Sequence, residues 1–169
     1  MTVKYQIGWV LMALWLLLVQ TGCTSQASPE PAPPSIHYGE DICEFCGMII
    51  SEERYAAGYI IRDGEARIFD DLAGMFQSQL QRQDDVLAFF VHDYADPHWI
   101  RAETALYVLA KDLPTPMLSG LVAAGSADKA EALAAEFNGQ VLTFDEVLAH
   151  YRQASSAKHS VGQTEHAHR

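Results

Sequence analysis

The sequence is poor in cysteine and in basic residues, and each shortage excludes a class of protein. Three cysteines in 169 residues are too few to staple a small fold with disulfides. Eleven lysines and arginines face 22 aspartates and glutamates, which gives a formal net charge of −11. This charge argues against nucleic acid as a partner and against electrostatic docking on anionic lipid. The sequence also lacks a spaced serine, histidine and aspartate set and a glycine-rich phosphate loop, so we predict that the protein is not an enzyme.

Long hydrophobic runs are scarce as well. The apolar run at residues 7–19 would form about 20 Å of helix, which is short of the roughly 30 Å hydrocarbon core of a bilayer. That length is typical of a signal peptide. The run is followed by Thr21, Gly22 and Cys23, which resemble the lipobox of bacterial lipoproteins. We therefore expect a signal peptide at residues 1–22 and a diacylglyceryl group on Cys23, with an ordinary signal peptide or an uncleaved anchor as the alternative.

The segment behind Cys23 predicts a tether and a location. Thr24, rather than aspartate, follows the cysteine, and enteric-type sorting rules then favour the outer over the inner membrane. Residues 24–35 contain four prolines and almost no bulky apolar side chain, a composition typical of an extended linker. We expect residues 23–39 to hold a folded domain away from a membrane surface.

The remaining residues predict an α+β fold. Short strands alternate with short helices and local hairpins, which favours α+β over a doubly wound sheet. Asp63 and Gly64 separate two apolar runs, which is a strong hairpin signal. Asp70 is placed to cap a helix that starts near Leu72.

Two segments share one layout at a displacement of 75 residues. "DGEARIFDDL" starts at Asp63 and "NGQVLTFDEVL" at Asn138, and each has a glycine, a phenylalanine five residues later and then an acidic pair. We interpret them as two copies of a turn, strand and helix-start unit, with coincidence as the alternative. The expected fold is therefore α+β with two small related ββαβ-like modules in tandem, at residues 40–95 and 96–152. A disordered, histidine-containing tail is expected at residues 153–169.

Cys43 and Cys46 are separated by two residues and followed by Gly47 and Met48. Covalent haem attachment is excluded because no histidine follows the second cysteine. A closed zinc site would need distant histidines, since no second cysteine pair exists. A redox pair is disfavoured because a strand-like run follows and because Glu44, between the thiols, would raise a thiol pKa. Cu(I) accepts a few soft thiolate or thioether ligands, so it is favoured over these and over a plain structural disulfide.

"DICEFCGMII" resembles the Cys-x-x-Cys-Gly-Met segment of the NosL family, and "IFDD", "VHDY", "WIRAETALYV", "TPM" and "GQVLTFDEVL" continue the resemblance in order. The resemblance implies two small related αβ modules. It also implies a periplasmic, membrane-anchored lipoprotein that acts as a Cu(I) chaperone. The expected recipient is the copper centre of nitrous oxide reductase, and the expected partners are an ABC-type transporter and its periplasmic component. The alternative function is a periplasmic thiol-disulfide oxidoreductase that uses the cysteine pair.

Carried over by this resemblance, the metal ligands are Cys43, Cys46, Met48 and Met117, the last from the "TPM" segment. The family usually continues with glycine after that methionine, whereas this chain has Leu118. We expect sulfur from both modules to meet in a shared cleft.

Two further polar pairs are weaker candidates. His92 lies at the end of an expected strand, where it could offer an imidazole to copper, although such a histidine more often caps a strand or meets a carboxylate. Asp70 and Asp71 could bind a hard cation, but helix capping explains both. We therefore expect His92 as an optional ligand and the two aspartates as structural residues.

Overall fold

The computed structural model describes the backbone of residues 30–166 and the side chains of residues 30–157. Contacts divide the chain into Met1–Glu30 and Pro31–Arg169, and the fold below is that of the second unit. The expected signal peptide and Cys23 lie outside the described residues. Within the described part of the chain, no helix combines the length and the apolar character needed to cross a membrane.

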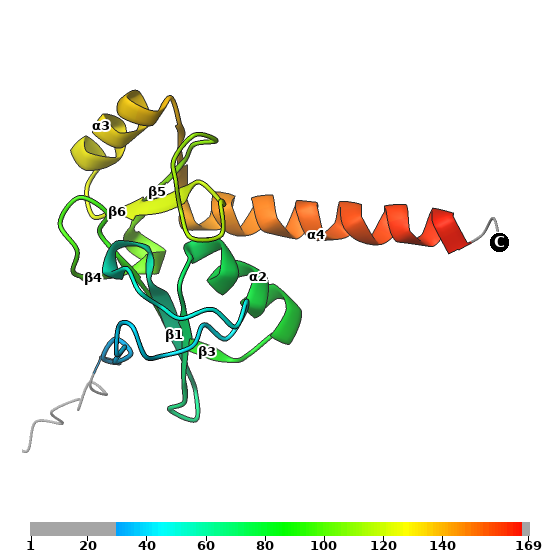
Figure 1. Ribbon diagram of the computed structural model, residues 1–169, viewed down its shortest axis with the longest axis horizontal. Coiled ribbons are helices and arrows are strands. Elements are labelled where there is room, and N and C mark those ends of the chain that lie inside the picture. Colours follow the sequence, from blue (N-terminus) through cyan, green and yellow to red (C-terminus); the bar gives the residue numbers. More distant parts are fainter. Residues whose placement is uncertain (1–29, 167–169) are drawn as a thin grey trace, which may run out of the picture. The chain divides into compact units, whose positions relative to one another are not determined.

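The first half of the folded unit forms an antiparallel sheet with one helix against it (Figure 1). The strands lie in the order β2-β1-β3-β4, so β1 and β3 are central. The predicted hairpin joins β1 to β2, and Gly64 at its tip has a φ of 92°, a value that glycine adopts without strain. In chain order the elements are the 3-10 helix η1 (Glu53–Tyr55), β1 (Ala57–Ile61), β2 (Ala66–Phe69), α2 (Leu72–Arg82), β3 (Val86–His92) and β4 (Trp99–Arg101).

The second half forms a smaller antiparallel sheet in the order β6-β5-β7, again with the first strand in the centre. The sequence β1-β2-α2-β3 and the sequence β5-β6-α3-β7 therefore share one ββαβ topology. This confirms the predicted α+β class. The elements are the 3-10 helix η2 (Ala102–Thr104), β5 (Leu106–Leu109), β6 (Leu121–Ala124), α3 (Ala127–Phe137), β7 (Gln140–Thr143) and α4 (Phe144–His166).

The structure corrects two details of the tandem arrangement. Strand β4 pairs with β3, so the first sheet extends to Arg101, beyond the module boundary expected at residue 95. The segments displaced by 75 residues are β2 with the start of α2 and β7 with the start of α4, and these do not occupy equivalent places in the two sheets. The topology instead pairs β2 and α2 with β6 and α3. A short strand followed by a helix with an acidic start occurs at several places in this fold, so finding the pattern twice does not show that the two places are equivalent.

The helix starts explain why acidic pairs recur. Asp71, rather than Asp70, is the N-cap of α2, and its Oδ1 accepts a hydrogen bond from the Ala73 N–H at 2.8 Å. At the start of α4, Thr143 and Glu146 form a capping box in which the Thr143 N–H donates to Glu146 Oε2 at 2.8 Å. One acidic residue of each pair therefore satisfies backbone groups at a helix end.

Helix α4 runs to His166, through residues that the sequence predicted to be a disordered tail. The tail prediction depended on low apolar content. However, residues 144–161 contain neither proline nor glycine, the two residues that most disfavour a helix. The capping box starts the helix, and adding a residue to an existing helix costs much less free energy than starting one. The helical state of residues 153–166 is therefore a correction to the predicted disorder.

The two sheets share one core. Phe76 of α2 packs with ring centroids 5.7 Å from Tyr107 of β5 and 6.1 Å from Tyr151 of α4. Tyr59 of β1 and Tyr107 of β5 are both fully buried in the same apolar cluster. Because each module alone would be too small to bury a sizeable core, this shared cluster makes them one folding unit.

A buried carboxylate also joins the modules. Asp93 follows β3 and forms an isolated parallel bridge with Ala123 of β6. Its Oδ2 accepts hydrogen bonds from the Gly125 N–H at 2.8 Å and from the Lys129 ammonium at 3.0 Å. Burial alone would raise the pKa of Asp93, but these hydrogen bonds lower it overall. We call the contact of Asp93 with Gly125 and Lys129 the aspartate latch.

Candidate metal centre

Residues 41–50, the cysteine loop, fold back on themselves at the edge of the first sheet. Ile42 and Ile49 form an antiparallel bridge, and the Cys43 N–H donates to the Met48 carbonyl at 2.8 Å. The turn between them closes with the Gly47 N–H donating to the Cys43 carbonyl at 2.9 Å. Gly47 has a φ of 76°, a conformation that most side chains disfavour, so the glycine of the motif allows the turn that brings the two thiols together.

The loop is fastened to β2 by its backbone and by charge. The Glu44 N–H donates to the Ile68 carbonyl at 3.0 Å. The Glu44 carboxylate faces Arg67 of β2 at 3.4 Å and Arg82 of α2 at 3.9 Å. Glu44, which the sequence analysis treated as a neighbour of the thiols, therefore pairs with two guanidinium groups.

Cys43, Cys46 and Asp70 bring their ligand atoms together. The two Sγ atoms and a carboxylate oxygen all lie within 4.8 Å of one another. Cys46, which is partly exposed, donates from its Sγ to Asp70 Oδ1 at 3.4 Å, whereas Cys43 is buried. Both cysteines are free thiols. Two thiols and one carboxylate at this spacing form a compact set of donors for a single metal ion.

The environment keeps one of the thiols protonated. Burial, together with a hydrogen bond to the Asp70 carboxylate, raises the pKa of Cys43 to about 12. A metal ion must therefore displace this proton before it binds the sulfur, which couples metal uptake to proton release.

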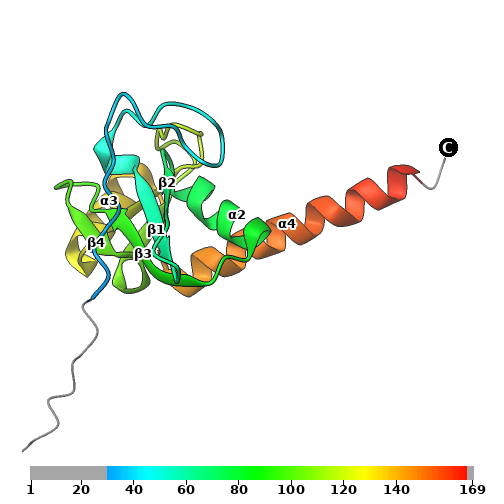
Figure 2. The same ribbon diagram turned by 90° about the horizontal axis from the view of Figure 1, so that it is seen from below.

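Residues 113–120, the methionine loop, come from the second module and reach the same place. The Met117 N–H donates to Asp71 Oδ2 at 3.1 Å, and the Ser119 hydroxyl donates to Asp71 Oδ1 at 2.8 Å. The Met117 Sδ lies 3.5 Å from the position that a Cβ would take at Gly74, and the Phe45 ring lies 3.4 Å from that position. Phe45 directly precedes Cys46, so the two loops meet at the amino-terminal end of α2 (Figure 2).

Met48 and His92, the other two predicted ligands, have different surroundings. Met48 is on the cysteine loop, and its side chain is 44% exposed. His92 is fully buried, with Nδ1 3.0 Å from the Ala56 carbonyl and Nε2 3.5 Å from the Tyr38 hydroxyl. Because a carbonyl only accepts hydrogen bonds, Nδ1 carries the proton of the neutral ring.

The surroundings of His92 indicate a packing role. Its ring centroid lies 3.8 Å from that of Trp99, and burial lowers its pKa despite the Glu53 carboxylate 3.5 Å from Nε2. The contacts of His92 therefore explain its burial without a metal.

Asp70 is a candidate ligand that sequence reasoning missed. The acidic pair at 70–71 was assigned to helix capping as a whole, although one helix has one N-cap residue. Because Asp71 fills that position, Asp70 is left to face Cys46. The signal in the sequence was the presence of two adjacent carboxylates before a helix that needs only one as its N-cap, which leaves the other available for a different role.

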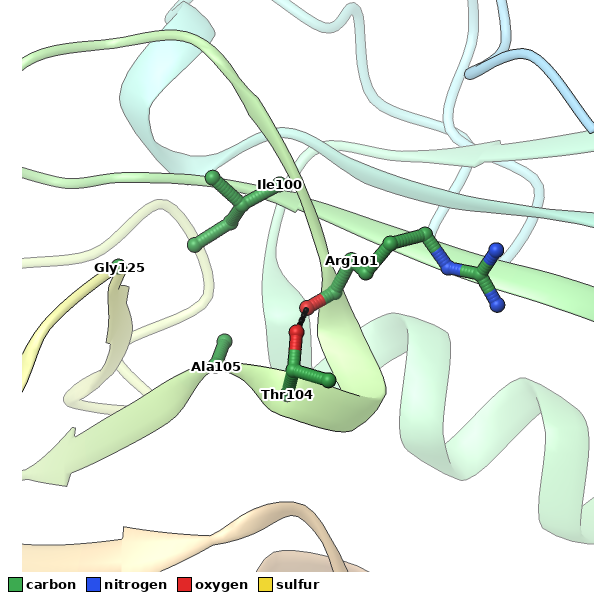
Figure 3. Close-up of a pocket in the computed structure, with 5 residues that line it drawn as sticks. All are labelled: Ile100, Arg101, Thr104, Ala105 and Gly125. Atoms are coloured by element: carbon green, nitrogen blue, oxygen red, sulfur yellow. Dashed lines mark hydrogen bonds between the residues drawn. The ribbon is translucent and has the colours of Figure 1, made fainter. Parts of the chain in front are cut away.

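A separate pocket shows no comparable chemistry. It has a volume of about 240 Å³ and lies between β4, η2 and the turn before α3 (Figure 3). The guanidinium of Arg101 points away from the other labelled side chains, toward Glu103, with which it pairs at 3.0 Å. The lining residues are Ile100, Arg101, Thr104, Ala105 and Gly125.

Comparison with known proteins agrees with this geometry. The family model described as NosL matches residues 35–152. The chain is 29% identical over 180 residues to the "Copper-binding lipoprotein NosL" of Stutzerimonas stutzeri, covering 99% of this chain and 94% of that protein. It also resembles the crystal structure of the copper chaperone NosL from Shewanella denitrificans, with a TM-score of 0.62 and 24% identity over 70% of this chain and 96% of the other, which supports the fold. Both relatives are named as copper-binding or chaperone proteins, not as enzymes. The family model covers most of the chain, and the chain therefore belongs to the NosL family.

Proposed function

We propose that this protein is a Cu(I) chaperone whose cargo is held by the Cys43 and Cys46 sulfurs, with Asp70 and Met117 as further ligands. The observation that carries the proposal is the convergence of two thiols and a carboxylate within 4.8 Å, with a thioether-bearing loop fastened to the same helix end. Thiolate and thioether are soft ligands, which favour Cu(I) over the harder divalent ions. The relatives' names, copper-binding lipoprotein and copper chaperone, support the same cargo.

The arrangement suits a metal that must be passed on. Cys43 is buried and holds its proton strongly, whereas Cys46 is partly exposed. Met117 belongs to a loop held by hydrogen bonds to Asp71 rather than by a strand. Copper would therefore enter and leave through Cys46 and Met117, and Cys43 would act as the inner ligand. Met48, whose side chain is exposed, would serve as an outer thioether during transfer.

The setting follows from the family membership. The named lipoprotein relative supports a lipid anchor on Cys23 and a location on the periplasmic side of a membrane, with the outer membrane favoured by Thr24. The proposed recipient is the copper centre of nitrous oxide reductase, reached with the help of an ABC-type transporter and its periplasmic component. These assignments depend on the resemblance of the motifs.

A thiol-disulfide oxidoreductase is the alternative, and the site geometry disfavours it. An attacking cysteine needs a lowered pKa, which a helix amino terminus or a nearby cation commonly supplies. Cys43 instead has a raised pKa, and both thiols sit in a loop beside a carboxylate.

The test is an anaerobic titration of the reduced protein with Cu(I) against a competing chelator. We expect about one tightly bound Cu(I) and a loss of affinity of tenfold or more in Cys46→Ser and Met117→Leu. Met75→Leu is the matched control, because Met75 is fully buried on α2 within the apolar core. A wild-type protein that binds no Cu(I), or a Met75→Leu variant as impaired as Met117→Leu, would contradict the proposal.

A further inference from the structure

The exposed apolar side chains of this protein are concentrated around the sulfur atoms. Six large hydrophobic residues are exposed among the described side chains, and five of them lie on the cysteine loop, just before it, or on the methionine loop. The sixth, Leu87, is on β3. The five are Tyr38, Ile42, Met48, Ile49 and Leu118. Because the cysteine loop and the methionine loop meet at the amino-terminal end of α2, these exposed side chains gather in one region, and exposed apolar groups gathered in this way commonly mark an interaction site.

Leu118 is the most unusual member of this group. Its side chain is 86% exposed, and its backbone has a φ of 55°, in the left-handed region that disfavours leucine. The Leu118 N–H donates to the Thr115 carbonyl at 2.9 Å and the Ser119 N–H donates to the Thr115 hydroxyl at 2.9 Å, so hydrogen bonds hold the backbone on both sides of the Leu118 side chain. Neither folding nor solubility accounts for a leucine here, because glycine or asparagine would suit both the backbone and the solvent better. Because Leu118 directly follows the candidate ligand Met117, its exposed side chain indicates a contact with another molecule near the metal site.

On the cysteine loop, Ile42 and Ile49 extend the same surface. They form a bridge in which neither hydrogen-bonds the other, so their side chains stand close together on one face of the loop. They are 51% and 53% exposed, and Met48 is 44% exposed beside Ile49. We call Ile42, Met48, Ile49 and Leu118 the apolar collar.

Acidic residues flank the collar and restrict what can cover it. Residues 40–53 contain five carboxylates and no lysine or arginine. Glu44 and Asp41 have partners within this chain, whereas Glu40 and Glu52 are exposed to solvent. A second copy would place like charges face to face, and an anionic lipid surface would be repelled in the same way.

We propose that the apolar collar is the docking surface for a partner protein whose own face has an apolar centre surrounded by lysine and arginine. The proposal rests on the proposed function, because this partner is the protein that gives copper to the site or receives it from the site. Docking on the collar would exclude water around Cys46 and Met117 while the metal changes ligands. Leu118 would insert into the apolar centre of the partner, and the acidic residues would orient the encounter.

The experiment measures binding of the purified, reduced protein to two probes in turn, apo nitrous oxide reductase and the periplasmic component of its maturation transporter. The central variant is Leu118→Asn, because asparagine tolerates the left-handed backbone and removes the apolar side chain. The control is Leu87→Thr, because Leu87 is also an exposed leucine, at 44% against 86% for Leu118, and lies on β3 rather than on either loop. Each protein is measured with and without one equivalent of Cu(I), at low and at high salt.

We expect at least one probe to bind, with affinity at least tenfold weaker for Leu118→Asn, unchanged for Leu87→Thr, and weaker at high salt. Cu(I) affinity in the chelator competition should stay within threefold of wild type for Leu118→Asn, which separates docking from metal binding. Failure of both probes to bind wild type, or equal binding by Leu118→Asn, overturns the collar and leaves the copper function intact. A collar-dependent dimer in sedimentation, or collar-dependent flotation with phosphatidylglycerol vesicles, overturns it in favour of a second copy or lipid. Failure of wild type to bind Cu(I) instead overturns the proposed function, whichever way the probes behave.

Discussion

The turns that lead into α2 and α3 occupy equivalent places in the two modules, yet only the α2 turn faces the sulfur atoms. Asp71 caps α2 and Ser126 caps α3. At the α2 turn, Asp71 also accepts a hydrogen bond from the Met117 N–H of the second module. At the α3 turn, the Gly125 N–H donates to Asp93 of the first module. Each turn is therefore a contact between modules as well as a helix start.

The two contacts differ in their chemistry, and we expect the Asp93 contact to hold the modules together more strongly than the Asp71 contact holds the methionine loop. The aspartate latch adds the Lys129 ammonium to the backbone hydrogen bond and buries the carboxylate of Asp93 completely. At the α2 turn, Asp71 is also buried, but its donors are the Ala73 and Met117 N–H groups and the Ser119 hydroxyl, with no cation among them. Because the aspartate latch adds an ion pair to its backbone hydrogen bond and the α2 turn does not, we expect the methionine loop to be held less strongly and to move more readily.

The largest expected effect lies at the latch. Asp93→Ala removes the acceptor for Gly125 and leaves Lys129 without its partner, so we expect the free energy of unfolding to fall by about 3 kcal/mol in urea denaturation. Cu(I) affinity, measured on the folded fraction, should change by less than threefold. A loss of copper affinity comparable to that of Cys46→Ser would show that the latch and the metal centre are not separate.

A smaller but broader effect is expected at the α2 turn. Asp71→Ala removes a helix cap and both hydrogen bonds to the methionine loop, which should lower the free energy of unfolding by about 2 kcal/mol. It should also weaken Cu(I) binding by about tenfold, because Met117 loses its support. The matched variant is Ser126→Ala, which removes the equivalent cap of α3 and should cost about 1 kcal/mol with no change in copper affinity. Equal copper affinities in the two variants would contradict the proposed role of the α2 turn.

The pH dependence of stability should reveal the latch in a second way. Because the pKa of Asp93 is lower in the folded protein than its usual value of 3.8, its contribution is complete above that value and is lost as the pH falls through the folded pKa. His92, whose pKa burial lowers from 6.5, opposes folding once the pH falls below 6.5, since its charged form is favoured only in the unfolded chain.

Urea denaturation at pH 7.5, 5.5 and 3 should therefore show two losses of stability. His92→Gln should remove part of the first loss, and Asp93→Asn part of the loss at acid pH. Unaltered pH profiles in both variants would contradict these assignments.

The smallest expected effect has the opposite sign. Leu118→Gly places glycine at a φ of 55° and removes an exposed leucine, so we expect the protein to become more stable by about 0.5–1 kcal/mol. Gln83, at φ 55° on the C-cap of α2, is the reference position, and Gln83→Gly should give a similar gain. A loss of stability in Leu118→Gly alone would mean that the leucine packs within this chain.

Local signals in the sequence were sufficient for much of this fold. The hairpin at Asp63 and Gly64 and the helix that starts near Leu72 depend on neighbouring residues, and the structure confirms both. Strand β4 was placed in the wrong module because which sheet a three-residue strand joins depends on partners distant in the sequence. The extent of α4 was missed because it continues from a capping box that lies before the weakly helical tail.

The sulfur-bearing residues of the candidate site could be proposed from the sequence, whereas its carboxylate could not. Cys43, Cys46 and Met117 follow from motif chemistry and the family resemblance, and the structure brings the two cysteines together and the methionine loop to the same helix end. Asp70 could not be separated from Asp71 without knowing which carboxylate turns into the helix. His92 was an open candidate because burial and the Ala56 carbonyl, which fix its ring, are tertiary features.

The buried position of Cys43 bears on how the empty protein would survive oxidants. Hydrogen peroxide and disulfides attack the deprotonated sulfur, and a thiol with a pKa near 12 presents almost none of that form at neutral pH. Cys46 is partly exposed, so an oxidant would reach it first, and Cys43 would be slow to convert the resulting sulfenic acid or mixed disulfide to a Cys43–Cys46 disulfide. The interior thiol would therefore slow the formation of the one disulfide that removes both sulfurs from a metal ion at once.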